Sequence, residues 1–290
     1  MEHNKSREII AIDKDSELFP HKLREIKNCP NKLYCIGNIE LLNMPAIAVV
    51  GSRKTTQYGR STAREIGDKL GSRGVVIVSG MAAGIDTCAH EGALKHGNKT
   101  IAVLGCGPDV CYPQINYKLK YNIEENGLVI SEFEPGTKPE KYYFPMRNRI
   151  ISGMSDATVV VQAGARSGAM ITAELAIEQN RDVYAVPGNI DSQYNLGSNK
   201  LIRDGAYPVL NVNDLLDSLG LGAIDDDEAE KLLSSSELEI YNLLRVQGEL
   251  TTDQLCIMTD TKPYLMAQMI AIMELKGIIF QDMGKVFIAK

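Results

Sequence analysis

Nine consecutive residues bring together three aromatic rings and three cations. They are Lys141, Tyr142, Tyr143, Phe144, Pro145, Met146, Arg147, Asn148 and Arg149. A buried core segment would need carboxylate partners for these cations, and the segment itself supplies none. Cations for phosphates beside rings for base stacking are typical of single-stranded nucleic-acid binding. The alternative is a partly solvated helix start whose arginines pair with acids elsewhere in the chain.

Glycine turns that lead into helices add a second kind of chemistry. Gly51-Ser52-Arg53-Lys54 follows one apolar run, and Arg166-Ser167-Gly168 follows another and opens a helix over residues 169–179. The backbone amides at such helix starts attract phosphate. The first turn is not G-x-G-x-x-G, which disfavours a dinucleotide site. Ser167 could also be the N-cap of an ordinary helix.

Asp86 and His90 stand four residues apart on a helix expected after the small-residue turn Ser79–Gly84. This spacing places both side chains on one helix face. We predict a mutual hydrogen bond that orders the turn, and a catalytic pair is the alternative.

The elements that position these loops are predicted from six apolar, β-branched runs. The stretches between the runs have the spacing of helices. The runs are Ile47–Val50, Val75–Val78, Ile101–Leu104, Leu128–Ile130, Thr158–Val161 and Val183–Val186. This alternation predicts an α/β fold, with a doubly wound, mostly parallel sheet covered on both faces by helices. Ligands of such sheets bind beyond the carboxyl ends of the strands, where the loops above begin.

The charge is unevenly distributed along the 290 residues, whose net charge is −6. Residues 46–213 hold 18 basic and 16 acidic side chains, whereas residues 214–231 hold 1 basic and 7 acidic ones. We therefore predict that the run Asp225–Glu228 belongs to a solvated linker between domains. We predict an N-terminal extension at 1–45, a sheet domain at 46–220, an acidic linker at 221–233 and a C-terminal domain at 234–290.

The C-terminal domain has the pattern of three helices and a hairpin. Helices are expected over Ser236–Val246, Thr251–Thr259 and Pro263–Leu275, followed by strands near Ile278–Phe280 and Val286–Ile288. This order predicts a winged helix. Its negative charge favours contact with a protein over duplex DNA.

Composition excludes several classes of protein. No signal peptide and no apolar run of membrane-spanning length occur, so we expect a cytoplasmic protein without a membrane partner. The six cysteines form no C-x-x-C pair, which predicts reduced thiols and neither a metal site nor a cofactor.

Seven motifs in this order resemble the DprA/Smf family of bacterial DNA-processing proteins, over roughly residues 17–216. They are GSR, SGMAAGIDTCAHEGAL, VLGCGPDVCYP, SEFEPGTKP, FPMRNRIISGMS, SGAMITAELAIEQNRDVYAVPGN and SNKLIRDGA. The resemblance implies a Rossmann-like domain that binds and protects single-stranded DNA, forms a homodimer and helps to load the RecA recombinase in natural transformation. It implies no catalytic residue.

The resemblance also implies which residues contact the strand. By position these are Gly51, Ser52, Arg53, Lys141, Phe144, Arg147, Asn148, Arg149, Ser167, Gly168, Asn199 and Lys200. The residues themselves add Lys54 and Arg166, the cations beside the two glycine turns. Dimerisation near the end of the sheet domain would involve the leucines of Asn213–Leu219, which could equally pack onto their own sheet.

Two features depart from the family pattern. Only about 45 residues precede the sheet, so the helical domain that many relatives carry there looks absent or vestigial, and Gln162 stands where a glutamate is commoner. An enzymatic alternative is hydrolysis of nucleoside monophosphates at the glycosidic bond, although residues 163–170 lack the P-G-G-x-G-T-x-x-E pattern of such enzymes. A sensor of a small nucleotide is a third possibility.

Overall fold

The computed structural model describes residues 8–221, 232–282 and 284–288, which form two compact units. The first unit spans residues 1–212 and the second residues 213–290. Each unit is described by itself.

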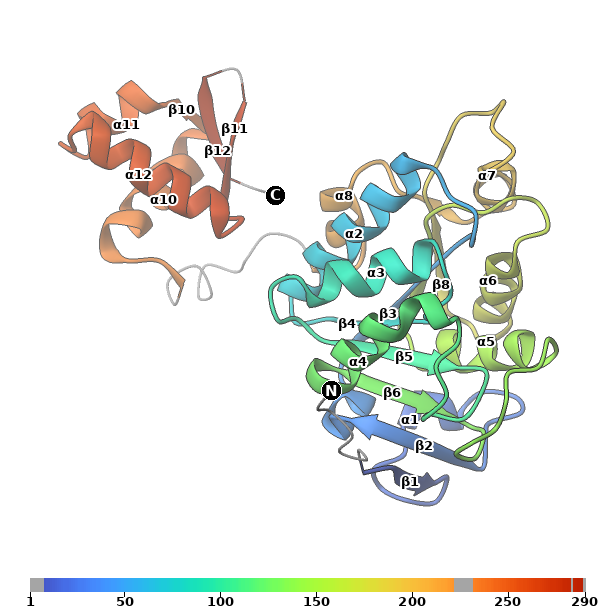
Figure 1. Ribbon diagram of the computed structural model, residues 1–290. Coiled ribbons are helices and arrows are strands. Elements are labelled where there is room, and N and C mark those ends of the chain that lie inside the picture. The colour runs from blue at the N-terminus through green and yellow to red at the C-terminus, as the bar shows by residue number, and fades with distance from the viewer. Residues whose placement is uncertain (1–7, 222–231, 283, 289–290) are drawn as a thin grey trace. The chain divides into compact units, whose positions relative to one another are not determined.

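A nine-stranded sheet is the centre of the first unit (Figure 1), with the order β1-β2-β6-β5-β4-β3-β7-β8-β9. The strands are β1 (Ile10–Asp13), β2 (Lys32–Gly37), β3 (Ala46–Val50), β4 (Val76–Ser79), β5 (Thr100–Leu104), β6 (Leu128–Ser131), β7 (Ala157–Val160), β8 (Asp182–Ala185) and β9 (Tyr207–Pro208). All pairs from β6 to β9 are parallel, which confirms the predicted α/β class.

The six apolar runs of the sequence form β3 to β8. All residues of β3, β4, β5, β6 and β7 are buried. Burial on both faces explains why these strands are continuous hydrophobic runs without polar alternation.

Helices cover both faces of the sheet. They are α1 (His21–Arg24), α2 (Gln57–Ser72), α3 (Ile85–Leu94), α4 (Tyr117–Asn126), α5 (Tyr143–Gly153), α6 (Gly168–Glu178) and α7 (Leu196–Arg203), with 3-10 turns η1 (Ile39–Asn43) and η2 (Gln114–Asn116). Right-handed crossovers place α2, α3 and α4 on one face, and α6 on the other. Figure 1 shows α3 and α6 on opposite sides of the strands.

The chain changes direction across the sheet between β3 and β7. The order runs outward from β3 through β4, β5 and β6, and then returns to β7 on the other side of β3. Val50 of β3 is paired with Val160 of β7, so the loops after these two strands diverge from one point. Such a switch point leaves a crevice between the loops, which is where ligands of this fold class bind.

The first 45 residues contribute two strands that the sequence analysis did not predict. β2 is antiparallel to β6 and β1 is antiparallel to β2, so the N-terminal extension enlarges the sheet. Phe19, Leu23 and Leu33 are fully buried and anchor this segment in the core of the unit.

The second unit contains a short helix α8 (Val212–Ser218) and then α10 (Ser235–Gln247), β10 (Glu249–Thr251), α11 (Thr252–Met258), α12 (Pro263–Leu275), β11 (Ile279–Asp282) and β12 (Lys285–Ile288). Its antiparallel sheet has the order β10-β12-β11. The three predicted helices are present, and Thr251 caps α11 in a capping box with Gln254, as its position before the helix predicted. β10 was not predicted.

Two leucines of α8 bear on the expected dimer. Leu215 and Leu216 are each 1 % exposed, so neither offers an open apolar edge to a second copy of the chain. The predicted linker run Asp225–Glu228 lies outside the described residues.

Deleting residues 225–290 should leave the sheet unit folded. The main apolar cluster of residues 12–201 and that of residues 233–286 share no side chain. We expect the circular dichroism melting temperature of the truncated chain to stay within about 4 °C of the sheet transition in the full chain. A non-cooperative melt would contradict the independence of the sheet unit.

Candidate functional site

The loop after β3 is held in a tight position at the switch point. The Ser52 amide donates to the Gln162 carbonyl, with 2.7 Å between nitrogen and oxygen. A Cβ on Gly51 would lie 2.5 Å from the Ile85 side chain, and a Cβ on Gly84 would lie 2.4 Å from the Ser52 carbonyl oxygen. Only glycine permits these approaches, so the loop is pinned between the end of β7 and the start of α3.

Gln162 organises the surroundings of this loop. Its buried side chain accepts hydrogen bonds from the Thr55 hydroxyl and the Thr56 amide, and donates to Asn195 Oδ1 at 2.8 Å. The uncharged amide thus joins the start of α2 to the residue before α7, as both a donor and an acceptor. A glutamate at this position could not donate to Asn195.

The first turn of α5 presents an aromatic ring to the same region. The Arg53 guanidinium lies 5.4 Å from the centroid of the Phe144 ring, within the range of a cation–π contact. The Tyr112 ring is 5.2 Å from that of Phe144, and a Cβ on Gly105 would touch the Phe144 ring at 3.0 Å. Phe144 is therefore positioned from two sides by groups far from it in the sequence.

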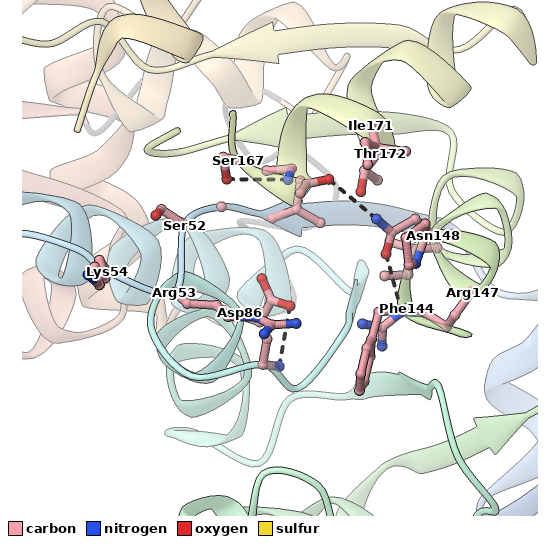
Figure 2. Close-up of a pocket in the computed structure, with 17 residues that line it drawn as sticks. Ser52, Arg53, Lys54, Asp86, Phe144, Arg147, Asn148, Ser167, Ile171 and Thr172 are labelled. Carbon is pink, nitrogen blue, oxygen red and sulfur yellow. Dashed lines mark hydrogen bonds between the residues drawn. The ribbon is translucent and has the colours of Figure 1, made fainter. Parts of the chain in front are cut away.

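These parts enclose one pocket of about 390 Å³ (Figure 2). Nine of the predicted site residues line it, namely Gly51, Ser52, Arg53, Lys54, Phe144, Arg147, Asn148, Ser167 and Gly168. They come from the loop after β3, from α5 and from the start of α6. The structure thus brings the loop after β3 against the start of α6, which follows more than a hundred positions later in the sequence.

Arg147 forms the buried floor of this pocket. It is 4 % exposed, and its guanidinium donates to the Gly80 carbonyl at 2.8 Å and to the Val103 carbonyl. Burial lowers the pKa of Arg147 to about 10, and the carboxylate of Asp86 acts in the opposite direction. Arg147 is therefore charged at neutral pH and is shielded from solvent.

Asp86 is the acidic side chain in the electrostatic field of this arginine. Burial raises the pKa of its carboxyl, and the Arg147 charge together with the backbone amides of Ala82, Gly51 and Gly80 opposes that rise. Of the two exposed cations that line the pocket, Arg53 is the one directed toward the Phe144 ring (Figure 2).

The start of α6 closes the far side of the pocket. Ser167 is the N-cap, and its hydroxyl accepts a hydrogen bond from the Ala169 amide. The Asn148 amide donates to the Gly168 carbonyl at 3.3 Å, which ties α5 to α6. Ser167 is therefore the N-cap that the alternative interpretation named, and it also lines the pocket. Phosphate binding at this helix start stays a prediction.

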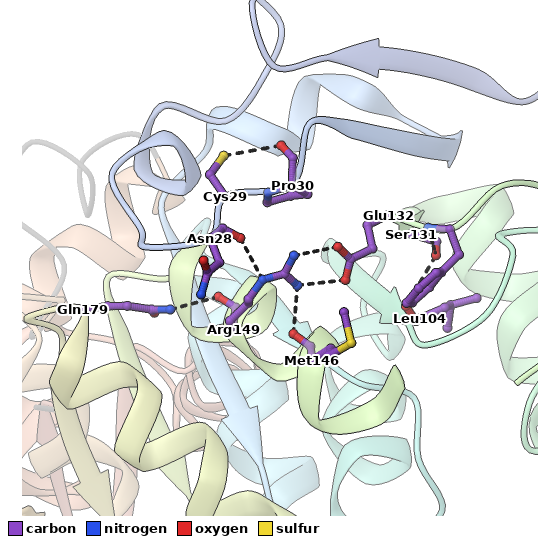
Figure 3. A network of polar contacts seen from close by, with 10 residues as sticks. Asn28, Cys29, Pro30, Leu104, Ser131, Glu132, Met146, Arg149 and Gln179 are labelled. Atoms are coloured by element: carbon purple, nitrogen blue, oxygen red, sulfur yellow. Dashed lines mark hydrogen bonds and ion pairs between the residues drawn. The ribbon is translucent and has the colours of Figure 1, made fainter. Parts of the chain in front are cut away.

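Arg149 occupies a different place from the other residues of its run (Figure 3). Its guanidinium forms a bidentate ion pair with Glu132, with distances of 2.8 and 2.6 Å, and also donates to the carbonyls of Asn28 and Met146. The two ion-pair side chains are 14 % and 13 % exposed. The alternative of an arginine paired with a distant acid thus holds for Arg149, and we exclude it from the strand-contacting set.

Four other predicted residues do not line the pocket. Lys141, Arg166 and Lys200 are exposed. The Asn199 side chain donates to the Gly188 carbonyl at 2.9 Å and accepts from the Gly188 amide at 3.1 Å. Asn199 is thus a support for the loop after β8, and the three cations lie outside the pocket.

The predicted hydrogen bond between Asp86 and His90 is wrong. His90 Nδ1 lies 2.7 Å from the Thr100 hydroxyl, and its Nε2 has no partner. Because Thr100 donates its one hydrogen to the Ile77 carbonyl, Nδ1 must be the donor. Burial lowers the pKa of His90 to about 3, so it is a neutral core side chain.

Sequence reasoning missed some residues of the pocket wall. Ala82, Ile171 and Thr172 line it, as does Asp86, which we had assigned to a pair with His90. The small-residue turn before α3 was a signal for Ala82 and Asp86. Nothing in the sequence distinguishes Ile171 and Thr172 from other residues of a packed helix.

The comparisons with known proteins agree with this architecture. Residues 10–220 match the family model of DNA recombination-mediator protein A. The chain belongs to this family. The DNA processing protein DprA of Streptococcus pneumoniae is 44% identical over 200 residues, which are 69% of this chain and 71% of that protein. Protein Smf of Synechocystis is 40% identical over 238 residues, or 80% of this chain and 60% of that one.

Solved structures of the family resemble the sheet unit. The DprA structure from Streptococcus pneumoniae gives a TM-score of 0.69 at 42% identity, and covers 72% of this chain and 74% of that chain. A structure from Helicobacter pylori, whose description concerns the single-stranded DNA binding mode of DNA processing protein A, gives 0.68 at 32% identity, and covers 74% and 96%.

Within the described ranges, no group of three or more histidine, cysteine or acidic side chains could hold a metal ion. No helix in that part of the chain has the length and apolar content needed to cross a bilayer.

Replacing Arg149 with alanine should destabilise the sheet unit. The substitution leaves Glu132 without its bidentate partner in a mostly buried position, which costs about 3 kcal/mol of unfolding free energy. Urea denaturation followed by circular dichroism measures the change. The control Arg53→Ala, which removes an exposed side chain, should cost less than about 1 kcal/mol. Equal stabilities of the two variants would contradict a structural role for Arg149.

Proposed function

We propose that this chain is a DNA-processing protein that binds single-stranded DNA in the pocket at the switch point. The observation that carries the proposal is the convergence of Arg53, Phe144 and two helix-start loops on one cavity. The Helicobacter pylori structure, described for its single-stranded DNA binding, supports the same ligand for the family. The relatives named for DNA processing support a DNA-processing role, which we propose belongs to natural transformation, as the family resemblance implies.

The pocket has the groups needed to hold one segment of a strand. Phe144 offers a ring for stacking on a base, and Arg53 can move from the ring to a phosphate. The Gly51-Ser52 and Ser167-Gly168 turns present backbone near helix starts, where anions are favoured. Arg147 supplies a fixed positive charge beneath them. None of these groups selects a base by its edge, so binding is expected to depend little on sequence.

Three exposed cations act outside the pocket. Lys141, Arg166 and Lys200 would attract the phosphates of the flanking strand, and the exposed Lys54, which lines the pocket, would add to this attraction. Asn148 and Asn199 act as supports through their bonds to Gly168 and Gly188.

The role of the protein in the cell is proposed from the family to which the chain belongs. We infer that the protein protects incoming single strands and helps to load RecA, as a cytoplasmic homodimer. The second unit, with three helices and a three-stranded antiparallel sheet, has the element order of a winged helix. Residues 232–290 carry 5 basic and 7 acidic side chains, which favours a protein partner over duplex DNA for this unit.

A nucleotide sensor remains a second candidate because of the pocket volume. About 390 Å³ is within the size range of small-molecule sites. Competition by thymidine monophosphate against a labelled strand tests this. A hydrolase is less well supported, because Asp86 accepts a hydrogen bond from the Ala82 amide beside the charge of Arg147, and His90 is neutral and contacts Thr100.

Single strands should bind more tightly than duplexes of equal length, and the affinity should fall with salt. Stacking on Phe144 requires an unpaired base, and each phosphate contact releases counterions. Fluorescence anisotropy with labelled oligonucleotides over a salt series measures both effects. Equal affinities for the two forms would refute the proposed pocket chemistry.

Arg53→Ala should weaken single-strand binding more than Lys141→Ala. Arg53 lines the pocket, whereas Lys141 is exposed outside it. Each variant should reduce the slope of log K against log salt by about 0.7 if it removes one phosphate contact, and only Arg53→Ala also disturbs the Phe144 surface. Thermal melts should show both variants to be as stable as the parent chain. A large loss of melting temperature would instead make the residue structural.

A further inference from the structure

A second cavity of about 420 Å³ adjoins the pocket, and the two share Arg53 and Lys54. Its lining residues are Arg53, Lys54, Thr55, Arg60, Arg64, Gly84, Thr87, Cys88 and Tyr194. We call this set the basic groove. Figure 2 shows the two shared side chains diverging, with Arg53 directed toward Phe144 and Lys54 directed away from it.

The charged residues that line the basic groove are all cations. They are Arg53, Lys54, Arg60 and Arg64, and in the described part of the chain the carboxylate of Glu91 borders the groove as the ion-pair partner of Arg64. The pocket, in contrast, includes Asp86 beside Arg147. In a chain with a net charge of −6, such a concentration of cations in one concave surface favours a polyanion.

The two outer arginines form a row on one face of α2. Arg60 and Arg64 are four residues apart, so their side chains are neighbours on the helix surface. Arg60 makes long contacts to described residues, at 3.5 Å to the Thr55 carbonyl and 3.3 Å to Gln57 Oε1. Both acceptors are uncharged, so neither contact neutralises the positive charge of Arg60.

Arg64 is paired in a way that a phosphate can replace. It contacts Glu91 at 2.9 and 2.8 Å, but the two side chains are 45% and 42% exposed. An ion pair with this much exposure contributes little to stability, so exchanging the carboxylate for a phosphate costs little.

We propose that the basic groove holds the phosphate backbone of the same single strand where the strand leaves the pocket. This inference rests on the proposed function. The shared residues Arg53 and Lys54 border both cavities, so one strand can contact the pocket and the groove together, an adjacency that a separate acidic partner would not require. The pocket then holds a stacked base, and the groove holds the neighbouring phosphates without reading bases.

The test compares oligothymidylates of about 2 and about 20 nucleotides on the full chain, by anisotropy over a salt series. A dinucleotide has one internucleotide phosphate, so the longer strand alone can place several phosphates along the groove. R60A/R64A should leave the short strand unaffected, and should lower affinity for the long strand roughly tenfold at low salt, with a loss of about 1.4 in the salt slope. R60Q/R64Q keeps long side-chain stems and should behave in the same way if the alanine variant folds poorly.

The matched control is K95A/K118A, which removes two positive charges from the same sheet unit outside both cavities. Lys95 forms an exposed ion pair with Asp68 at 3.2 Å, as Arg64 does with Glu91, and Lys118 is exposed on α4. This control should bind both strands like the parent chain.

Three results would overturn the proposal. Equal losses for short and long strands would mean that the arginines act on the pocket. Equal losses in the control would mean a general charge effect. Unchanged binding of the long strand would mean that the groove does not hold the strand and binds another partner, such as an acidic protein segment. Failure of the parent chain to bind the short strand, in contrast, would refute the pocket itself.

Discussion

A single buried cation connects the parts of the proposed site. The guanidinium of Arg147 donates to carbonyls that follow β4 and end β5, and lies in the field of Asp86 from α3. A charge in this position requires partners on several sides, since a buried ion is costly unless it is paired and hydrogen-bonded. The partners fix α5 against the strand ends, and the same helix carries Phe144 into the pocket. Gly80 permits the approach, because a Cβ there would lie 2.5 Å from the guanidinium.

The sheet was predictable because its strands are buried on both faces. Six apolar runs stand out in the sequence for that reason, and all of them form strands. β1 is only 4 residues long and alternates between buried and exposed positions, so its signal was weak. The edge strand β9 has 2 residues, both exposed, and no hydrophobic pattern could reveal it. These short strands form because they pair with strands that are distant in the sequence, which the local sequence does not reveal.

The loops of the site could be predicted from the sequence, but the partner of each charged side chain could not. Glycine turns and the aromatic-basic run identified nine pocket residues, because backbone shape and residue type are local properties. Arg149 and Arg147 have the same chemistry two positions apart, yet one pairs with Glu132 and the other contacts Gly80. Both partners are distant in sequence. For the same reason, the ring of His90 turns toward Thr100, which no spacing rule within α3 anticipates.

The position of the pocket at the switch point has a consequence for folding. Its walls come from residues 50–54, 82–86, 144–151 and 167–172, which meet only after the return from β6 to β7 has formed. Contacts of such large sequence separation carry a high loop-closure entropy and form late. A chain that has assembled only one half of its sheet therefore has no site. A ligand of the pocket would therefore bind only those chains in which the whole sheet has formed. Such binding would raise the apparent stability of the whole unit by mass action.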